Sequence, residues 1–421
     1  MAEPERKRMI NLNIDVAIIG GGPAGLAAAV SAHESGANSV IILDRNSWVG
    51  GILTQCIHDG FGVEETGISM TGPEYADRYI KKAKKYGIKF MNETMVLQIE
   101  KNKTIKAINK KGLYNIKAKS IILAMGCREK TRWSVLIPGD RPSGIYTAGV
   151  AQAFINLYNI MVGKNVVILG SGDVGLIMAR RLKFEGANVI GVVEILPHAS
   201  GLPRNIVQCL DDYDIPLYLN HTVTYIKGRE RLESIKIAQI DEKRNIIKGT
   251  EREIKCDTLL LSLGLIPENE LSSNVGVEID KITGGPIVNQ SFETTVPGIF
   301  VCGNCLQVYD TVDLLAIDAK KAGENAVKKT NTQSKNIIVK SGKGIRHVIP
   351  QIINNPGKIH FTLRLEDIME TPVLHVFADK KEIFKKKLPW ANPANMVDFY
   401  IDISPEIFKS SHSLEVDLDD R

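Results

Sequence analysis

Two side chains in one loop are candidates for redox or proton-transfer chemistry. Cys56 and His58 lie in residues 50–60, a stretch too rich in glycine and polar residues to form a core segment. A thiol there could cycle through a sulfenic acid, and a histidine beside Asp59 could exchange a proton near neutral pH. The structural alternatives are a small buried thiol and a loop histidine whose hydrogen bonds are satisfied. Both interpretations of each residue stay open.

Cys302 and Cys305 have the Cys-x-x-Cys spacing of redox and metal sites. They flank a Gly-Asn dipeptide at the end of an apolar strand, and the sequence offers no second pair to complete a set of four ligands. We therefore predict a structural role for them and no metal site. Six cysteines scattered over 421 residues form no disulfide framework, which favours a reducing, cytoplasmic location.

A glycine turn stands between an apolar strand, residues 16–19, and an alanine-rich helix. Gly20, Gly22 and Gly25 match the dinucleotide-binding fingerprint, in which the turn and the helix N-terminus hold a pyrophosphate. The next strand ends at Asp44, at the spacing expected of a ligand for a ribose hydroxyl. Strand, turn, helix, strand and acid in this order indicate a dinucleotide-binding domain.

The same unit recurs later in the chain, about 150 residues on. Gly170, Gly172 and Gly175 repeat the spacing, and the following strand ends at Glu194. A carboxylate at that position accepts the ribose 2′-OH of NADH and repels the 2′-phosphate of NADPH. We therefore expect NADH to be preferred over NADPH.

The remaining patterns give the elements that must position these motifs. Helices are predicted over residues 73–86, 148–157 and 314–328. A β-meander is predicted from the segments 95–99, 104–108 and 113–116, and buried strands from 120–126, 258–267 and 299–304. From about residue 335 onward apolar residues alternate with period two, which predicts a small all-β region.

Composition and charge exclude several classes of protein. A net charge of +5 is small for 421 residues, and no basic, aromatic-rich motif indicates a nucleic-acid partner. No run approaches the ~18 apolar residues needed to span a bilayer, and no cleavage-like site follows the charged N-terminus. We expect neither a signal peptide nor a transmembrane segment.

These landmarks resemble the two-dinucleotide-binding-domain flavoproteins of the pyridine nucleotide–disulfide oxidoreductase superfamily, over residues 14 to about 330. Residues 294–304, Thr-Thr-Val-Pro-Gly-Ile-Phe-Val-Cys-Gly-Asn, look like the family's return motif, which usually ends in Gly-Asp. In that family the first fingerprint binds FAD and the second binds NAD(P)H. The amide of Asn304 can still hydrogen-bond a hydroxyl of the flavin's ribityl chain.

The resemblance implies a set of ligands for each cofactor. For FAD they are Gly20, Gly22, Pro23, Ala24, Gly25, Asp44, Arg45, Gly51, Ile52, Gly126, Gly303 and Asn304. For NAD they are Gly170, Gly172, Asp173, Val174, Gly175, Glu194 and Gly264. Cys56 and His58 are the catalytic candidates beside the flavin.

The expected fold is α/β, with two Rossmann-like dinucleotide-binding domains, the second inserted in the first, and a small all-β C-terminal domain. Residues 1–158 and 285–332 are predicted to form a discontinuous FAD-binding domain. Residues 159–284 are predicted to form the NAD(P)-binding domain, and residues 333–421 the β-rich C-terminal domain.

The sequence departs from the disulfide reductases of the superfamily. Only Cys56 stands where many members carry two cysteines, and residues 145–152 lack the dithiol of the thioredoxin-reductase branch. Residues 55–62, 137–142 and 147–149 resemble a narrower branch, which holds the FAD subunits of opine, amine and hydrogen-cyanide-forming dehydrogenases and flavoproteins encoded beside glycerol-3-phosphate genes. That branch implies a partner subunit with an iron–sulfur centre or a second flavin.

We therefore expect an oligomeric FAD-dependent oxidoreductase that exchanges a hydride with NAD(H) and passes electrons to a partner protein or small acceptor. One alternative is an NADH oxidase or peroxidase that works through Cys56. Another is the FAD subunit of a dehydrogenase for an organic substrate of glycerol-3-phosphate, amine or opine type. A flavin-binding redox sensor or assembly factor with negligible turnover is the third.

Overall fold

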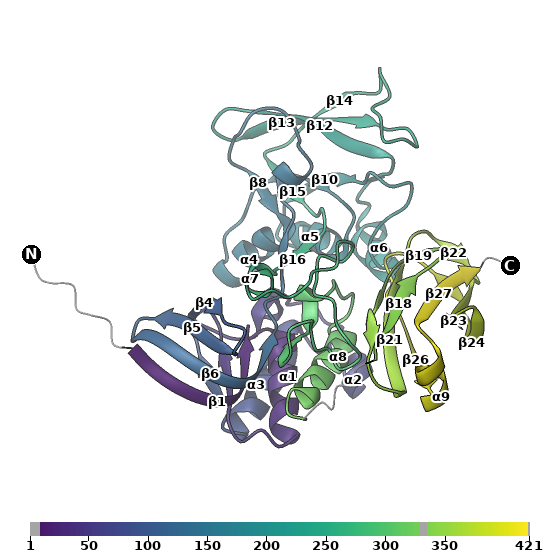
Figure 1. The fold of residues 1–421 in the computed structure, drawn as a ribbon. Helices are drawn as coiled ribbons and strands as arrows, with labels where there is room; N and C mark the ends of the chain where they lie inside the picture. The colour runs from purple at the N-terminus through teal and green to yellow at the C-terminus, as the bar shows by residue number, and fades with distance from the viewer. Residues whose placement is uncertain (1–8, 329–334, 420–421) are drawn as a thin grey trace, which may run out of the picture. The chain divides into compact units, whose positions relative to one another are not determined.

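The computed structural model describes residues 9–328 and 335–419, and the chain forms two compact units (Figure 1). The first unit contains the residues up to Cys127 together with those from Pro267 onward, and the second contains Arg128–Ile266. A Rossmann-like sheet lies at the centre of each unit, and a β-rich region ends the first. The predicted fold class is confirmed.

The first unit is built on a mixed sheet with a parallel centre. Its strands, in order across the sheet, are β3 (Lys89–Met91), β2 (Val40–Leu43), β1 (Met9–Ile19), β6 (Gly112–Leu123), β5 (Thr104–Asn109) and β4 (Met95–Ile99), with β17 (Ile299–Val301) beside β6. β2 and β6 run parallel to β1, and β17 runs parallel to β6, whereas β5 is antiparallel to β6. All four residues of β2 are buried, as expected of a strand covered on both faces.

Helices α1 (Pro23–Glu34) and α8 (Val312–Asn325) lie side by side in this unit (Figure 1). Small residues allow the close approach, since a Cβ placed on Gly323 would stand 2.2 Å from the carbonyl oxygen of Ala28. The other helical segments of the unit are α2 (Val63–Thr66), α3 (Gly72–Lys85), α7 (Glu270–Asn274) and the 3₁₀ turns η1 (Gly51–Gln55) and η4 (Gly303–Cys305). Thr71 and Glu74 start α3 with a capping box.

The C-terminal region has its own apolar core between two sheets. One sheet is ordered β20 (Ile352–Ile353), β18 (Ile337–Ser341), β27 (Ser413–Asp419), β23 (Val373–Ala378) and β24 (Lys381–Lys387). The other is ordered β19 (Ile345–Ile349), β21 (Gly357–Leu365) and β26 (Val397–Ile403). A ribbon of β22 (Met369–Glu370) and β25 (Trp390–Ala391) and the short helix α9 (Pro405–Ser410) complete it.

The second unit has a parallel sheet ordered β11 (Leu217–Tyr218), β10 (Asn188–Val193), β9 (Asn165–Leu169), β15 (Thr258–Leu261) and β8 (Ile145–Thr147). An antiparallel sheet follows the order β12 (His221–Gly228), β13 (Leu232–Gln239) and β14 (Arg252–Lys255). Its helical segments are α4 (Ala148–Tyr158), α5 (Asp173–Phe184), α6 (Pro203–Cys209), η2 (Arg132–Ser134) and η3 (Asp211–Tyr213). β7 (Cys127–Glu129) and β16 (Leu265–Pro267) pair with each other.

The division into units differs from the predicted domains in three respects, the first being that the β-rich C-terminal region falls in the first unit and not in a unit of its own. β8 and α4 belong to the second unit, because β8 pairs with β15 and α4 packs against α5. Residues 267–284 belong to the first unit, because Asn269 Nδ2 donates a hydrogen bond to the carbonyl oxygen of Cys305 at 2.8 Å. The segments 113–116 and 120–126, predicted as separate strands, form the single strand β6.

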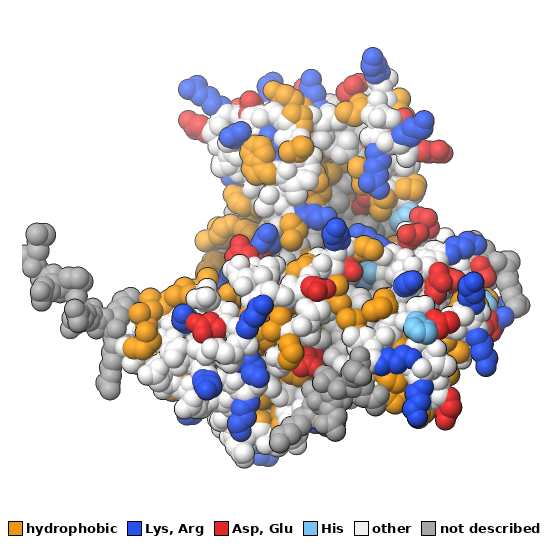
Figure 2. Space-filling model, in the orientation of Figure 1, with side chains coloured by type: hydrophobic (Ala, Val, Ile, Leu, Met, Phe, Trp, Pro, Cys, Tyr) orange, Lys and Arg blue, Asp and Glu red, His pale blue; other side chains and the backbone are white. Residues whose placement is uncertain are grey.

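The surface is mixed in charge. On the face drawn in Figure 2, Lys and Arg side chains are interspersed with Asp and Glu side chains. None of the helices in the described part of the chain combines the length and the apolar character needed to cross a bilayer.

Candidate functional site

The first fingerprint forms a tight turn between β1 and α1. A Cβ on Gly25 would stand 1.9 Å from the carbonyl oxygen of Gly20, so any side chain there would push the helix away from the strand. Around Gly22 the space is free, since a Cβ would meet only the Cα of Gly51 at 3.9 Å. The first turn of α1, which begins at Pro23 and Ala24, carries no acidic residue. Its free N–H groups can therefore donate hydrogen bonds to an anionic pyrophosphate.

Asp44 stands at the end of β2 and is buried. Its Oδ2 accepts the N–H of Gly21 at 2.7 Å, and its Oδ1 accepts the N–H of Asn46 at 2.8 Å. These bonds fix the carboxylate beside the glycine turn, where a ribose hydroxyl would be recognised. Arg45, next to it, is exposed, and so is Ile52 in η1.

The return motif meets the fingerprint at Gly303, where a Cβ would stand 2.6 Å from the Cβ of Ala24. The N–H of Tyr309 donates to Asn304 Oδ1 at 3.1 Å, and Asn304 Nδ2 donates to Cys127 Sγ at 3.6 Å. Because a backbone N–H can only donate, it fixes the orientation of the amide, with the NH₂ group facing Cys127. Gly126 precedes this cysteine and has open space around its Cα.

The fold thus brings the predicted FAD ligands together at the carboxyl ends of β1, β2, β6 and β17, where open α/β sheets bind ligands. Free space at Gly22, a first helical turn without acids and a fixed carboxylate suit the pyrophosphate and ribose of FAD. Cys127 and Tyr309 were not predicted as part of this site. Their contacts depend on loop geometry, although Cys127 directly follows a predicted ligand.

Cys56, Cys302 and Cys305 of this unit are buried thiols, whereas Cys127 is partly exposed. Cys56 Sγ donates to the carbonyl oxygen of Ile52 at 3.3 Å, and burial raises the pKa of Cys56 to about 12. Cys305 Sγ donates to the carbonyl oxygens of Leu123 and Cys302 at 3.3 and 3.2 Å, and burial raises the pKa of Cys305 to about 11. The thiolate is the reactive form, so these values favour structural roles. Among the described residues, no cluster of metal-ligating side chains occurs.

His58 lies in the same loop as Cys56, and its ring centroid is 5.0 Å from that of Phe61. The two rings are tilted by 48°. Its role as an acid or base stays a prediction.

The second fingerprint lies between β9 and α5. A Cβ on Gly175 would stand 3.0 Å from the carbonyl oxygen of Gly170 and 2.7 Å from Ser262 Cβ, and one on Gly172 would stand 3.2 Å from Ser262 Oγ. The helix and strand of this turn pack closely, but less closely than in the first turn, and its middle glycine has less space. Val174, in the first turn of α5, is partly exposed, and a Cβ on Gly264 would meet no atom within 4 Å.

Glu194 is buried at the end of β10. Its Oε2 accepts the N–H and the Oγ–H of Ser171 at 2.8 and 2.5 Å and the Oγ–H of Ser200 at 3.1 Å. Its Oε1 accepts the N–H of Leu196 at 2.9 Å. The two serines were not predicted, because serine hydroxyls have no sequence pattern that would link them to this acid.

Asp173 supplies an acid in the first turn of α5. Its Oδ1 accepts the N–H of Leu202 at 2.8 Å and the Nδ2–H of Asn205 at 2.7 Å. The segment 198–205 is thereby held against the N-terminus of this helix. A dinucleotide that binds here meets a carboxylate where the first unit has none.

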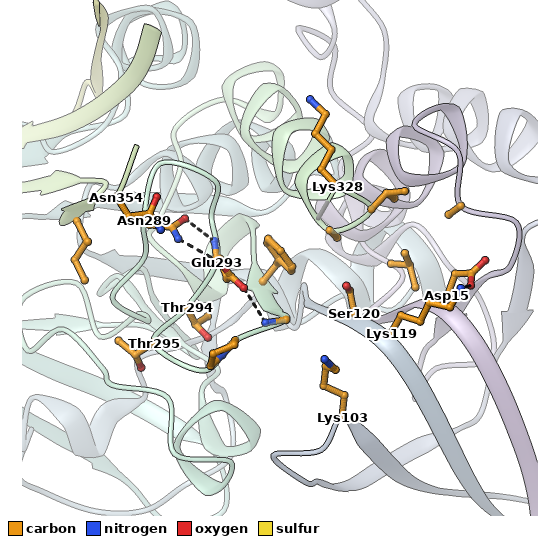
Figure 3. Close-up of a pocket in the computed structure, with 18 of the residues that line it drawn as sticks. Asp15, Lys103, Lys119, Ser120, Asn289, Glu293, Thr294, Thr295, Lys328 and Asn354 are labelled. Carbon is orange, nitrogen blue, oxygen red and sulfur yellow. Dashed lines mark hydrogen bonds and ion pairs between the residues drawn. The ribbon is translucent and has the colours of Figure 1, made fainter. Parts of the chain in front are cut away.

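A polar hollow of about 990 Å³ occurs elsewhere in the first unit (Figure 3). It lies against Val16 of β1 and Ser120 of β6, upstream of the strand ends that carry the fingerprint. Lys119 Nζ contacts Asp15 Oδ1 at 2.7 Å, and Glu293 Oε1 accepts the N–H of Gly298 at 2.8 Å. The residues that line it include none of the predicted FAD ligands.

Several relatives of known activity are similar to this chain. NADH dehydrogenase of Bacillus subtilis strain 168 is 28% identical over 298 residues, which cover 69% of this chain and 53% of that protein. Ferredoxin–NADP reductase of Picrophilus torridus is 25% identical over 302 residues, or 70% of this chain and 86% of that protein. An opine oxidase subunit of Agrobacterium tumefaciens strain Ach5 is 26% identical over 316 residues, or 69% and 61%. The chain therefore spans only about half of the first of these relatives.

Two solved structures share the fold. Thioredoxin reductase of T. acidophilum aligns with a TM-score of 0.60 and 25% identity, over 75% of this chain and 98% of that one. An NAD-dependent persulfide reductase of A. fulgidus aligns with a TM-score of 0.58 and 16% identity, over 93% of this chain and 71% of that one. The model of the pyridine nucleotide-disulphide oxidoreductase family matches residues 14–352. The chain thus belongs to the pyridine nucleotide-disulphide oxidoreductase family, whose members are FAD- and NAD(P)-dependent oxidoreductases.

Proposed function

We propose that this chain is an FAD-dependent oxidoreductase that exchanges a hydride with NAD(H) and passes electrons to a partner protein or small acceptor in the cytoplasm. The observation that carries the proposal is the pair of fingerprint units, each with its turn and its buried acid in place. Bound FAD would supply hydride and electron transfer, chemistry that no side chain offers.

In the first unit the N-terminus of α1 would hold the pyrophosphate of FAD, and Asp44 would accept a ribose hydroxyl. Asn304 would bind the ribityl chain through its oriented amide. Each group is fixed by hydrogen bonds within the protein, so it is positioned before the ligand arrives.

In the second unit Glu194 supports a preference for NADH. The carboxylate is buried, and the residues that follow it, Ile195, Leu196 and Pro197, provide no cation for a 2′-phosphate. A phosphate brought near this acid would meet like charge in a poorly solvated place.

A thiol relay is not part of the proposal. The family's dithiol positions hold Cys56 alone, and burial raises the pKa of Cys56 to about 12. A thiol with this pKa stays protonated at neutral pH, which weighs against a peroxidase that uses it as nucleophile.

The similarity to an opine oxidase subunit supports a second candidate, the FAD subunit of a dehydrogenase for an organic substrate. Such a protein would receive electrons from the substrate and pass them to its partner. The two candidates differ in whether NADH reduces the flavin.

Anaerobic stopped-flow absorbance at the flavin band tests the choice. The purified, FAD-loaded protein is mixed with NADH and, separately, with NADPH. Rapid bleaching with NADH and slower bleaching with NADPH are expected. If neither nucleotide bleaches the flavin, the NAD(H) proposal is wrong and the organic-substrate dehydrogenase takes its place.

A further inference from the structure

Strand β21 is buried on both faces, unlike the half-buried strand that its alternating pattern predicts. Phe361 and Leu363 belong to the core between the two C-terminal sheets. On the other face lie His360, Thr362 and Arg364, of which the first two are buried and the third is partly buried. Polar side chains in such a position require partners, and each of these three has at least one in the dinucleotide-binding part of the same unit.

These partners lie in the segment that directly follows the return motif. Gln307 is buried, and its Nε2 donates to Thr362 Oγ1 at 2.7 Å. Gln307 Oε1 lies 3.3 Å from Nε2 of His347, on the neighbouring strand β19. Burial lowers the pKa of His347 to about 4, so the ring is neutral at pH 7 and donates this hydrogen bond from Nε2.

Arg364 forms hydrogen bonds with Val308 and Asp310, the next residues of this segment. Its Nη2 donates to the carbonyl oxygen of Val308 at 2.9 Å and to Asp310 Oδ1 at 2.7 Å. Its Nη1 donates to the carbonyl oxygens of Pro393 and Ala394 at 2.8 and 3.0 Å. The guanidinium thereby ties residues 308–310 to the C-terminal region with a planar group that lysine cannot replace.

Tyr309 lies between the two residues that Arg364 holds. Its N–H donates to Asn304 Oδ1, which fixes the side-chain amide at the flavin site, and its hydroxyl donates to the buried Asp318 at 2.7 Å. His360 Nδ1 contacts the other oxygen of Asp318 at 2.9 Å. The polar face of β21 thus fixes Tyr309 in two ways. Arg364 binds Val308 and Asp310, the residues on either side of it, and His360 binds Asp318, which accepts its hydroxyl.

We propose that Arg364 and Gln307 are positioning residues for FAD. They hold residues 307–310 so that the N–H of Tyr309 orients the amide of Asn304 toward the ribityl chain. This inference rests on the proposed function, which assigns Asn304 to FAD. It makes the affinity for FAD depend on contacts made by the C-terminal β-rich region, which carries none of the predicted FAD ligands.

The experiment measures FAD binding to flavin-free protein by fluorescence titration for Arg364→Gln, Thr362→Val and Arg346→Gln. Arg346→Gln is the matched control, because it removes the same charge from an exposed position on β19. Loss of hydrogen bonds to a charged group should raise the dissociation constant of Arg364→Gln about tenfold, with a smaller rise for Thr362→Val and none for the control. A shift of the bound flavin's visible spectrum should accompany the change, which overall loss of stability would not produce.

A double-mutant cycle links the effect to Asn304. If Arg364 acts through Asn304, Arg364→Gln should weaken FAD binding much less in an Asn304→Ala background than in the wild type. Additive effects, or a wild-type affinity and spectrum in Arg364→Gln, would overturn the inference. Circular-dichroism melts show that each variant is folded, and Thr362→Val, which keeps the side chain's shape, supplies the same test if Arg364→Gln does not fold.

The same data separate this inference from the proposed function. If Asn304→Ala binds FAD as the wild type does, the assignment of Asn304 to FAD is wrong and the positioning role falls with it. If Asn304→Ala weakens binding and Arg364→Gln does not, the site assignment stands and only the positioning role is wrong.

Discussion

The two glycine turns have the same spacing, yet different groups stand at the helix that follows each. In the first unit, Gly22 faces open space and the first turn of α1 has no acid. In the second, Asp173 lies in the first turn of α5 and ties the segment 198–205 to it. The acid at the ribose position also differs, since Asp44 accepts backbone N–H groups while Glu194 also accepts two serine hydroxyls.

Two units with the same fingerprint can therefore differ in their affinity for a dinucleotide. Positive potential at the N-terminus of α1 is available to a pyrophosphate, whereas Asp173 neutralises part of it at α5. We infer that the first unit is suited to a cofactor that stays bound and the second to one that exchanges. Substitutions in the two units test this contrast.

The largest effect is expected from a side chain at the third glycine of each turn. In Gly25→Val the Cβ alone would stand 1.9 Å from the carbonyl oxygen of Gly20, which is a severe clash. Over-packing of this kind costs about 3 kcal/mol, so FAD binding should weaken about 100-fold. Gly175→Val should keep FAD and lose reduction by NADH. The flavin content of the purified proteins checks FAD binding, and anaerobic mixing with NADH checks reduction; a fully loaded Gly25→Val protein would contradict the contrast.

Charge removal at Glu194 should change the choice of nucleotide. Glu194→Gln keeps an oxygen for the N–H of Leu196 and removes the repulsion of a 2′-phosphate. The ratio of NADPH to NADH binding should rise about tenfold, as expected when one like-charge contact worth about 1.4 kcal/mol is lost. Isothermal titration with each nucleotide measures the ratio. Asp44→Asn is the control in the first unit and should leave it unchanged.

Asp173→Asn should strengthen binding in the second unit. The amide oxygen can still accept from Leu202 and Asn205, so the segment 198–205 stays in place while the charge is lost. A charge at a helix terminus is worth about 0.3–1 kcal/mol, so NADH should bind about twofold to fivefold more tightly. Weaker binding in a folded variant would show that the carboxylate assists the dinucleotide and that the contrast is wrong at this position.

The first unit should also show a pH dependence that the second lacks, through His360. Burial alone would lower the pKa of His360, but hydrogen bonds to Asp318 and Asp398 outweigh it and raise the pKa above 6.5. Both ring nitrogens face carboxylates, an arrangement that favours the imidazolium form, in which both nitrogens donate. The other titratable groups around these three residues include Lys321, Tyr309, Tyr400, Lys386, Glu64 and Cys302.

A raised pKa fixes the sign of this effect. The stabilising contribution is fully present below the unfolded-state pKa of 6.5 and is lost as the pH rises through the higher folded-state value. The temperature of FAD release should therefore fall as the pH rises above 6.5, and His360→Gln should flatten that slope. An equal slope in the wild type and in His360→Gln would show that His360 does not cause the pH dependence.

The smallest effect is expected at Cys56. Because burial raises the pKa of Cys56 to about 12, Cys56→Ser should change NADH oxidation with oxygen or peroxide by less than about twofold. Steady-state rates with both acceptors measure it. A large loss with peroxide alone would restore the peroxidase interpretation.

The fingerprints and the acids could be predicted from sequence, because fixed spacings relative to strands and helices define them. The residues that form hydrogen bonds with the site residues could not be predicted from sequence. Cys127 and Tyr309 contact Asn304 through loop conformations, and the hydroxyl of Ser200 reaches Glu194 because the segment 198–205 folds back. Local patterns do not encode such contacts.

The C-terminal region shows the same limit. His360, Thr362 and Arg364 alternate with apolar residues and therefore resemble the solvent face of a strand. Period-two patterns report which residues share a face, not what covers that face. The boundary at Arg128 was missed for a similar reason, since β8 joins the second unit through pairing with β15, far along the chain.

The insertion of the second unit into the first has a consequence for synthesis. Arg128–Ile266 is one continuous stretch that can fold as soon as it leaves the ribosome, since domains generally fold as units during translation. The sheet of the first unit can be completed only when β17 has been synthesised, because β17 pairs with β6 and follows the inserted unit in the chain. Until then residues 121–123 of β6 have no neighbour on the edge where β5 pairs with residues 112–117, and this stretch could pair wrongly with another chain. If the first unit binds FAD as proposed, its flavin site is completed only late in the synthesis of the chain.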